Sequence, residues 1–205
     1  AEEIGRIVPI DGEVKSFFSN SGTEANEAAI KLARYHTKRP FLIAFLGSFH
    51  GRTLGSLGLT SSRAVQRKGF GPVTTPGVFH APYRDVYRAL AGVSPAQVAA
   101  ESIAWIEDRL LVNLVSPDEV AAIVVEPIQG EGGYIVPPPD FLSTLQDLCR
   151  SHGMLLVLVE IGFADDIAAL HRPVLLRIRE QLSLARRGKL GPSSKVRRLR
   201  RADRI

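Results

Sequence analysis

The chain alternates short, almost wholly apolar runs with longer segments in which apolar residues recur every three or four positions. The apolar runs are typical of strands buried on both faces, and the recurrence is typical of helices with one buried face. The predicted strands are residues 14–19, 41–46, 121–125 and 154–159. The predicted helices run from Ser21 to about Lys38, from 94 to 115 and from 141 to 151. This alternation predicts an α/β fold, a mostly parallel sheet flanked by helices.

Residues 51–82 contain several glycines and no strong periodicity, so we expect a long and functional loop region there. Ligands of parallel sheets bind outside the carboxyl ends of the strands. Four residues fall just past predicted strands or in the loops that follow them: Ser21, Phe49, Glu126 and Glu160. We therefore expect them to line one cleft.

The turn at Ser21, Gly22 and Thr23 joins a predicted strand to a predicted helix. The first N–H groups of a helix have no partner within it and lie at the positive end of its dipole, which favours an anion. Gly22 leaves room for a phosphate group, and the two hydroxyls add donors. A simple helix cap remains the alternative, because Ser21 and Glu24 have capping-box spacing.

Three segments, in this order, form a more specific signal: NSGTEANEAAIKLAR at 20–34, SFHGRT at 48–53 and VEPIQGEGG at 125–133. They resemble the signatures of the class III aminotransferases, which use pyridoxal phosphate, and especially the 4-aminobutyrate, ornithine and acetylornithine aminotransferases. The resemblance covers residues 17–158 and implies part of the large cofactor domain of a type I pyridoxal-phosphate enzyme. The chain is about half as long as those enzymes, so we expect it to be a piece of a larger protein.

The resemblance also implies roles for individual residues. Arg52 would receive a substrate carboxylate, and Glu131 would act as a gate whose arginine partner lies farther downstream than this chain extends. The implied cofactor-binding residues are Ser21, Gly22, Thr23, Phe49, His50 and Glu126. The alternatives are a core phenylalanine at 49, a structural histidine at 50 and a solvent-facing arginine at 52.

The sequence departs from the family after the last predicted strand. Val159 stands where the family has the aspartate that pairs with the pyridine nitrogen, and Gly162 replaces a glutamine. Glu160 is a poor substitute, because successive strand residues point to opposite faces. No lysine for the Schiff base is recognisable, since Lys189 has the right separation but an arginine- and glycine-rich context. We therefore expect no catalytic residue and no activity in this chain, and interpret the change as a shifted reading frame or a truncation.

Charge divides the chain at the same place. Residues 160–205 contain 12 Lys and Arg against 5 Asp and Glu, a net of +7, which leaves 14 against 16, a net of −2, for residues 1–159. We expect residues 1–160 to form the partial cofactor domain and residues 161–205 a divergent, poorly ordered basic tail. The single cysteine, Cys149, lies in an apolar helical stripe and is predicted to be a core residue.

The function predicted from the resemblance is transfer of an amino group from 4-aminobutyrate, or a similar ω-amino acid, to 2-oxoglutarate through pyridoxal phosphate. Ornithine and acetylornithine remain alternative donors. Two other classes also remain: a catalytically dead cofactor-binding or dimerisation remnant, and a tail that binds nucleic acid or anionic membranes, although it lacks aromatic residues for base stacking. We expect a cytoplasmic protein, homodimeric when intact, with no metal site and no membrane span.

Overall fold

The computed structural model describes residues 2, 15–71, 77–89 and 91–159. Within them lies one sheet of four strands in the spatial order β2-β1-β3-β4, and all neighbouring strands are parallel. The strands are β1 (Phe41–Phe45), β2 (Val78–Ala81), β3 (Val120–Val125) and β4 (Leu155–Leu158). The predicted parallel α/β fold is confirmed.

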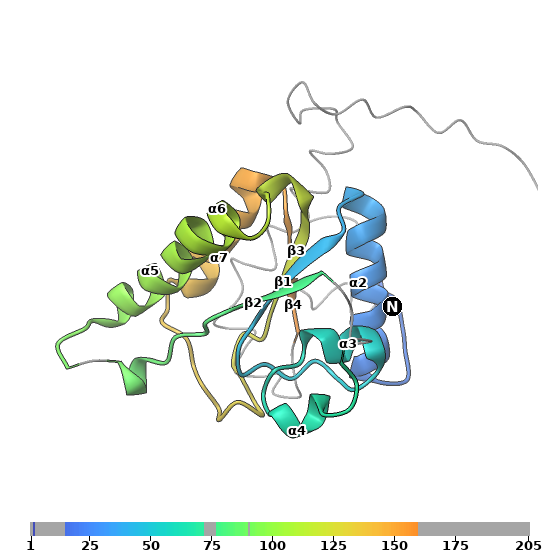
Figure 1. The fold of residues 1–205 in the computed structure, drawn as a ribbon, viewed down its shortest axis with the longest axis horizontal. Helices are drawn as coiled ribbons and strands as arrows, with labels where there is room; N and C mark the ends of the chain where they lie inside the picture. Colours follow the sequence, from blue (N-terminus) through green and yellow to red (C-terminus); the bar gives the residue numbers. More distant parts are fainter. Residues whose placement is uncertain (1, 3–14, 72–76, 90, 160–205) are drawn as a thin grey trace, which may run out of the picture.

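Helices cover both faces of this sheet (Figure 1). Helices α5, α6 and α7 lie on one face, and α2 and α3 lie on the other. The helices are α2 (Gly22–Thr37), α3 (Leu54–Leu59), α4 (Ala64–Arg67), α5 (Pro95–Trp105), α6 (Leu111–Asn113) and α7 (Phe141–His152). The helices predicted at α2 and α7 are confirmed to within two residues at their ends.

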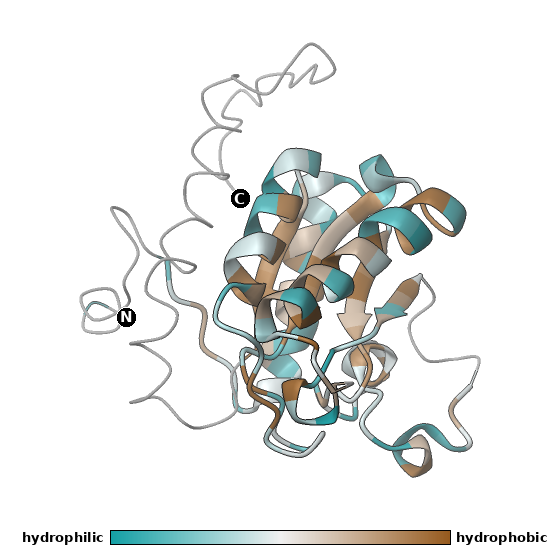
Figure 2. Cartoon of the chain, turned by 90° about the vertical axis from the view of Figure 1, so that its left-hand side faces the viewer, coloured by the Kyte–Doolittle hydropathy of each residue, from teal (hydrophilic) through white to brown (hydrophobic). Residues whose placement is uncertain are grey.

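Alternate residues of the strands build two separate cores. Ile43 and Ile123 face the α5–α7 side, and Leu42 and Ala122 face α2. Figure 2 shows that hydrophobic residues concentrate along the strands, as expected for strands buried on both faces. The thiol of Cys149 is fully buried in the first core, where burial raises its pKa. The prediction of a core cysteine is confirmed.

The predicted strand at residues 14–19 is wrong, because residues 15–19 form no strand. The side chains of Phe17 and Phe18 are 77% and 64% exposed. An apolar segment becomes a strand only where a neighbouring strand completes its hydrogen bonds. The described residues offer 15–19 no such neighbour.

The predicted loop region at 51–82 also needs correction, because it contains α3, α4 and β2. Strand β2 pairs in parallel with β1, and its His80 lies opposite Ala44. These elements are only four to six residues long. A helix of four residues completes barely one turn, so its periodicity cannot be read from the sequence.

The helix predicted at 94–115 begins as expected, with Ser94 as cap and Pro95 in the first turn. It does not continue as one regular α-helix. A π-helical turn at residues 106–110 separates α5 from α6, and the Leu111 N–H donates to the Ile106 carbonyl. This hydrogen bond spans five residues, one more than in an α-helix, and Ile106 and Leu111 are both buried.

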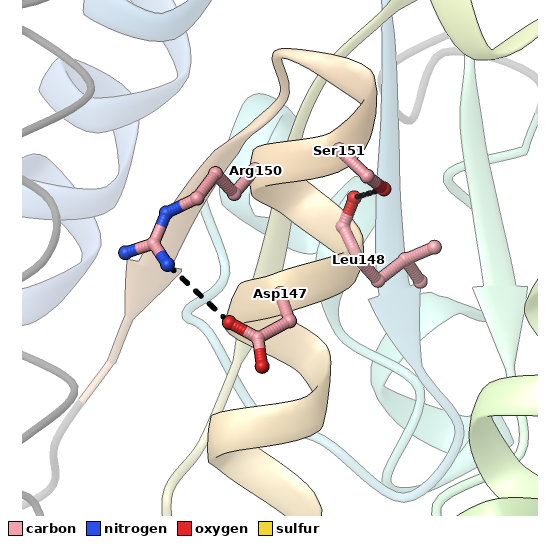
Figure 3. Close-up of polar contacts among 4 residues, drawn as sticks. All are labelled: Asp147, Leu148, Arg150 and Ser151. Carbon is pink, nitrogen blue, oxygen red and sulfur yellow. Dashed lines mark hydrogen bonds and ion pairs between the residues drawn. The ribbon is translucent and has the colours of Figure 1, made fainter.

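Helix α7 leads the chain back to the sheet. Gly153 ends the helix with a positive φ of 64°, the left-handed conformation that favours glycine at this position. Near this end an Arg150 nitrogen lies 3.4 Å from an Asp147 oxygen, and the Ser151 hydroxyl donates to the Leu148 carbonyl at 2.8 Å (Figure 3). The Asp147 side chain is exposed, and ion pairs in contact with solvent stabilise a protein little. The helix therefore depends mainly on its buried apolar face.

Arg39 joins three elements at the amino end of the sheet. Its Nη1 donates to the Val120 carbonyl at 3.1 Å and to the His152 carbonyl at 3.0 Å. The same nitrogen lies 3.5 Å from the Pro117 carbonyl. One guanidinium therefore connects the starts of β1 and β3 with the end of α7.

Replacing Arg39 tests this connection. Arg39→Met keeps an unbranched apolar stem but leaves the carbonyls without their donor, so we expect the free energy of unfolding to fall by about 2 kcal/mol. Urea unfolding of the two proteins measures the difference. Arg39→Lys retains one charged donor and should lose less; equal stability of all three proteins would contradict the connection.

Candidate functional site

Three segments meet at the carboxyl edge of the sheet: the start of α2, the residues after β1 and the residues after β3. The Phe49 N–H donates to a Glu126 carboxylate oxygen at 2.5 Å, which joins the second segment to the third. The hydroxyls of Thr23 and Thr53 lie 2.9 Å apart, which joins the first to the second. Phe49 and Glu126, two of the four residues expected to line one cleft, lie at the same edge of the sheet, whereas Glu160 lies outside the described residues.

The start of α2 has features of both predicted alternatives, a helix cap and an anion-binding site. Ser21 is the cap, and its hydroxyl accepts the Glu24 N–H at 3.4 Å. The Glu24 carboxylate accepts the Asn20 N–H at 2.7 Å. The N–H groups of Gly22 and Thr23 have no acceptor among the described residues, and a Cβ added to Gly22 would meet no atom within 4 Å. The cap therefore leaves two amides and open space for an anion.

The hydroxyl of Thr23 does not add a donor to the open space at Gly22. It lies 2.6 Å from the Ser56 hydroxyl as well as close to Thr53. The Thr53 hydroxyl in turn donates to the Glu27 carboxylate, which also accepts the Ser56 N–H at 3.0 Å. Thr23 therefore offers an anion its backbone N–H alone, and the predicted additional hydroxyl donor at this position is engaged within the protein.

Phe49 and Arg52 lie side by side. The Phe49 ring is half-buried and belongs to neither core, which argues against a purely structural phenylalanine. The Arg52 guanidinium carbon lies 6.0 Å from the centre of that ring, within the range of a cation–π contact, and its side chain is exposed. An aromatic face and an exposed positive charge thus adjoin each other.

His50 is buried, with only 2% of its surface exposed. Its backbone is fixed on both sides: its N–H donates to the Thr60 hydroxyl at 2.9 Å, and its carbonyl accepts from the Asn26 amide at 2.7 Å. Neither ring nitrogen has a hydrogen-bond partner within the described part of the chain. Burial, and to a lesser extent His80, lowers the pKa of His50 to about 4, so the ring is neutral at pH 7.

Glu126 is fully buried directly after β3. Its second oxygen accepts the Gly130 N–H at 2.9 Å, so both oxygens bind backbone amides. Burial raises the pKa of this carboxyl, and the two amides partly offset that rise. Tyr83, two residues past the end of β2, supports the same place, because its hydroxyl lies 3.2 Å from the carbonyls of Glu126 and Pro127.

Gln129 and Arg63 are site residues that the sequence did not single out. The Gln129 amide donates to the Leu46 carbonyl at 2.8 Å and closes the loop after β3 onto the loop after β1. The only feature of the sequence that could have indicated Gln129 is its position inside the 125–133 motif. An Arg63 nitrogen lies 3.9 Å from a Glu131 oxygen on the surface, so Glu131 has a partner arginine within the chain. No sequence pattern connected those two residues.

Val159 lies just past β4, and its N–H donates to the Val125 carbonyl at 2.9 Å. Its side chain packs against the apolar core under α2. The open turn at Gly22 and the half-buried Phe49 ring fit the phosphate and ring of pyridoxal phosphate, whereas Val159, which the resemblance aligns with the acid partner of the pyridine nitrogen, carries no acid. Lysines 15, 31, 38 and 68 are exposed, and Gly162 and Lys189 lie outside the described residues.

Comparisons with known proteins identify the family. A family model described as "Aminotransferase class-III" matches residues 1–164, so the chain belongs to the class III aminotransferases, which depend on pyridoxal phosphate. A solved structure of the ω-transaminase from Pseudomonas jessenii, in complex with PMP, superposes with a TM-score of 0.69 at 31% identity. The match covers 76% of this chain and 35% of that one. It confirms the predicted fold of type I pyridoxal-phosphate enzymes.

Curated relatives show how varied this family is. The probable 4-aminobutyrate aminotransferase of Bacillus subtilis is 40% identical over 166 residues, and the 5-aminovalerate aminotransferase of Pseudomonas aeruginosa is 42% identical over 162. An alanine/serine racemase of Pyrococcus horikoshii is 37% identical over 165. These matches cover 78% to 80% of this chain but only 34% to 38% of the relatives. The chain spans little more than a third of their length.

Two features are absent from the described residues. No helix among them is long and apolar enough to cross a membrane. They also contain no group of three or more His, Cys, Asp or Glu side chains placed to hold a metal ion.

The depressed pKa of His50 predicts how stability depends on pH. Below the ordinary histidine pKa of about 6.5 the unfolded chain binds a proton that the folded chain does not, so stability falls as pH drops. The loss should reach about 3 kcal/mol near pH 4 and then level off. Urea unfolding between pH 7.5 and 4.5 measures it. His50→Gln, which cannot titrate, should lose correspondingly less over this interval; equal losses would contradict the assignment.

Proposed function

We propose that the intact form of this protein is an aminotransferase for ω-amino acids, which takes its amino group from 4-aminobutyrate or a similar donor and passes it to 2-oxoglutarate. The observation that carries this proposal is the meeting of two free helix amides, an aromatic face and an exposed arginine at one sheet edge. The chain's membership of the class III aminotransferases supports it.

Pyridoxal phosphate, when bound, supplies an electron-withdrawing ring that stabilises charge on the substrate carbon. In our proposal the N–H groups of Gly22 and Thr23 bind its phosphate, and the positive end of α2 adds to their attraction. Phe49 presents its ring to the cofactor ring. Glu126 fixes the Phe49 backbone through its short hydrogen bond. The ring of His50, the next residue in the chain, is buried and neutral at pH 7.

Arg52 is the proposed receptor for a substrate carboxylate. A planar guanidinium binds a carboxylate through two parallel hydrogen bonds, and no carboxylate of the described residues pairs with Arg52. Donors such as 4-aminobutyrate and 5-aminovalerate, named for two relatives, keep the carboxylate several bonds away from the reacting amine. An arginine beside the ring face, rather than within the phosphate seat, suits such molecules.

We also propose that the intact enzyme is a homodimer. Large apolar side chains next to the motif segments are exposed in the single chain: Phe17 and Phe18 before the α2 turn, and Tyr134 after the 125–133 motif. A second subunit would cover them, since exposed apolar clusters commonly mark interfaces.

Residues 1–205 alone should bind the cofactor without turning over. Val159 cannot hold a proton on the pyridine nitrogen, and the lysines of the described residues are all exposed. Loss of a covalent catalytic residue commonly costs several powers of ten in rate. We expect no glutamate to form from 4-aminobutyrate and 2-oxoglutarate in the presence of this chain.

A negative charge introduced at the cap of α2 tests the proposed phosphate site at Gly22 and Thr23. Ser21→Asp and Ser21→Asn both keep a good cap, but only aspartate adds a negative charge. We expect Ser21→Asp to bind pyridoxal phosphate at least about tenfold more weakly than Ser21→Asn in equilibrium dialysis, because like charges at this distance repel strongly.

Pyridoxal, which lacks the phosphate, is the control ligand. Its binding should differ little between the two variants. Equal effects on both ligands, or no retention of pyridoxal phosphate by the unmodified chain, would contradict a phosphate seat at Gly22 and Thr23.

A further inference from the structure

Glu27 accepts two hydrogen bonds from the segment that carries Arg52. The Thr53 hydroxyl and the Ser56 N–H, the latter at 3.0 Å, both donate to the same oxygen, Glu27 Oε1. These two residues lie one and four positions after Arg52. A single carboxylate oxygen thus holds the Arg52 segment against the helix.

Glu27 also orients a hydroxyl cluster, formed by Thr23, Thr53 and Ser56. Because the Thr53 hydroxyl gives its proton to Glu27, its oxygen can only accept from the hydroxyls of Thr23, at 2.9 Å, or Ser56, at 3.0 Å. The Thr53 N–H donates to the Thr23 oxygen at 3.4 Å. Removing the Glu27 acceptor therefore frees the whole cluster to rearrange.

Two glycines show how closely the segment approaches the helix. Gly51 has a φ of 122°, and a Cβ there would overlap the Thr23 hydroxyl. A Cβ on Gly55 would overlap the Glu27 carboxylate. Thr23 and Glu27 are four residues apart and share one helix face. Arg52 lies between these two points of close contact.

A third α2 side chain extends this support. The Asn26 amide donates to the His50 carbonyl at 2.7 Å. The Arg52 side chain itself contacts only the Phe49 ring among the interactions found in the described residues. Its position therefore depends on the backbone on either side of it, which α2 holds.

We propose that Glu27 is a positioning residue that sets the place of Arg52 relative to the start of α2. The site then prefers ligands whose carboxylate reaches Arg52 while their phosphate binds at Gly22 and Thr23. This inference rests on the proposed function. It assigns to Glu27 an effect on ligand selectivity, transmitted through Thr53 and Ser56.

Two substitutions separate the geometry of Glu27 from its charge. Glu27→Gln removes the charge but keeps an oxygen that can accept both donors. Glu27→Met removes the charge and the acceptor while keeping the chain length. Removing a negative charge alone should strengthen anion binding to both variants alike. A difference between them therefore reports position.

The experiment uses two non-covalent probes with the full 205-residue chain. N-(5′-phosphopyridoxyl)-4-aminobutyrate carries phosphate, ring and carboxylate, and N-(5′-phosphopyridoxyl)butylamine lacks the carboxylate. We expect the unmodified chain and Glu27→Gln to prefer the first probe by about tenfold in equilibrium dialysis. Glu27→Met should reduce that preference to about twofold or less and bind the butylamine probe about as well as Glu27→Gln does.

Each other outcome has a definite meaning. If the unmodified chain shows no preference, the carboxylate role of Arg52 fails, and this inference fails with the proposed function. If it prefers the first probe and Glu27→Met retains that preference, the positioning role is overturned while the proposed function stands. Should Glu27→Met not fold, Thr53→Val, which replaces the hydroxyl that binds Glu27 by a methyl group, decides: a weakened preference supports the role, and an unchanged one overturns it.

Discussion

The site depends first on the carboxylate of Glu126, which lies buried between two loops and accepts a backbone N–H from each. A buried carboxylate without donors would be strongly destabilising, so this arrangement requires Phe49 and Gly130 to present their amides together. The contact converts two separate strand ends into one surface. The hydroxyl cluster and Glu27 then attach that surface to the start of α2.

The elements that could be predicted from the sequence are those whose buried faces appear as a pattern of apolar residues. Strand β3 is apolar at every position because both of its faces are buried, and α7 repeats its apolar residues along one face. Strand β2 is only partly buried at three of its four positions and contains His80, so it shows no continuous apolar run, and it forms because β1 offers it hydrogen bonds. The same dependence on a neighbour explains the error at residues 14–19, where an apolar segment has no described strand beside it.

The candidate site was predictable to a similar extent. The three motifs and their order indicated Gly22, Phe49 and Glu126, and the structure brings their segments together. The partners that hold them, such as Tyr83 and Glu27, could not be found, because hydrogen bonds between residues distant in sequence follow from the packing of whole elements. The roles of individual residues toward a ligand stay predictions.

In the proposed function Val159 limits the chemistry, while the turn at Gly22 has open space for a phosphate. We propose that the start of α2 binds the cofactor phosphate through two backbone amides. The most direct measurement is a ¹H–¹⁵N NMR titration of the chain with pyridoxal phosphate, followed at the amides of Gly22 and Thr23. These two amides should shift most, and pyridoxal without its phosphate should leave them nearly unchanged. Equal shifts with both ligands, or the largest shifts elsewhere, would contradict the claim.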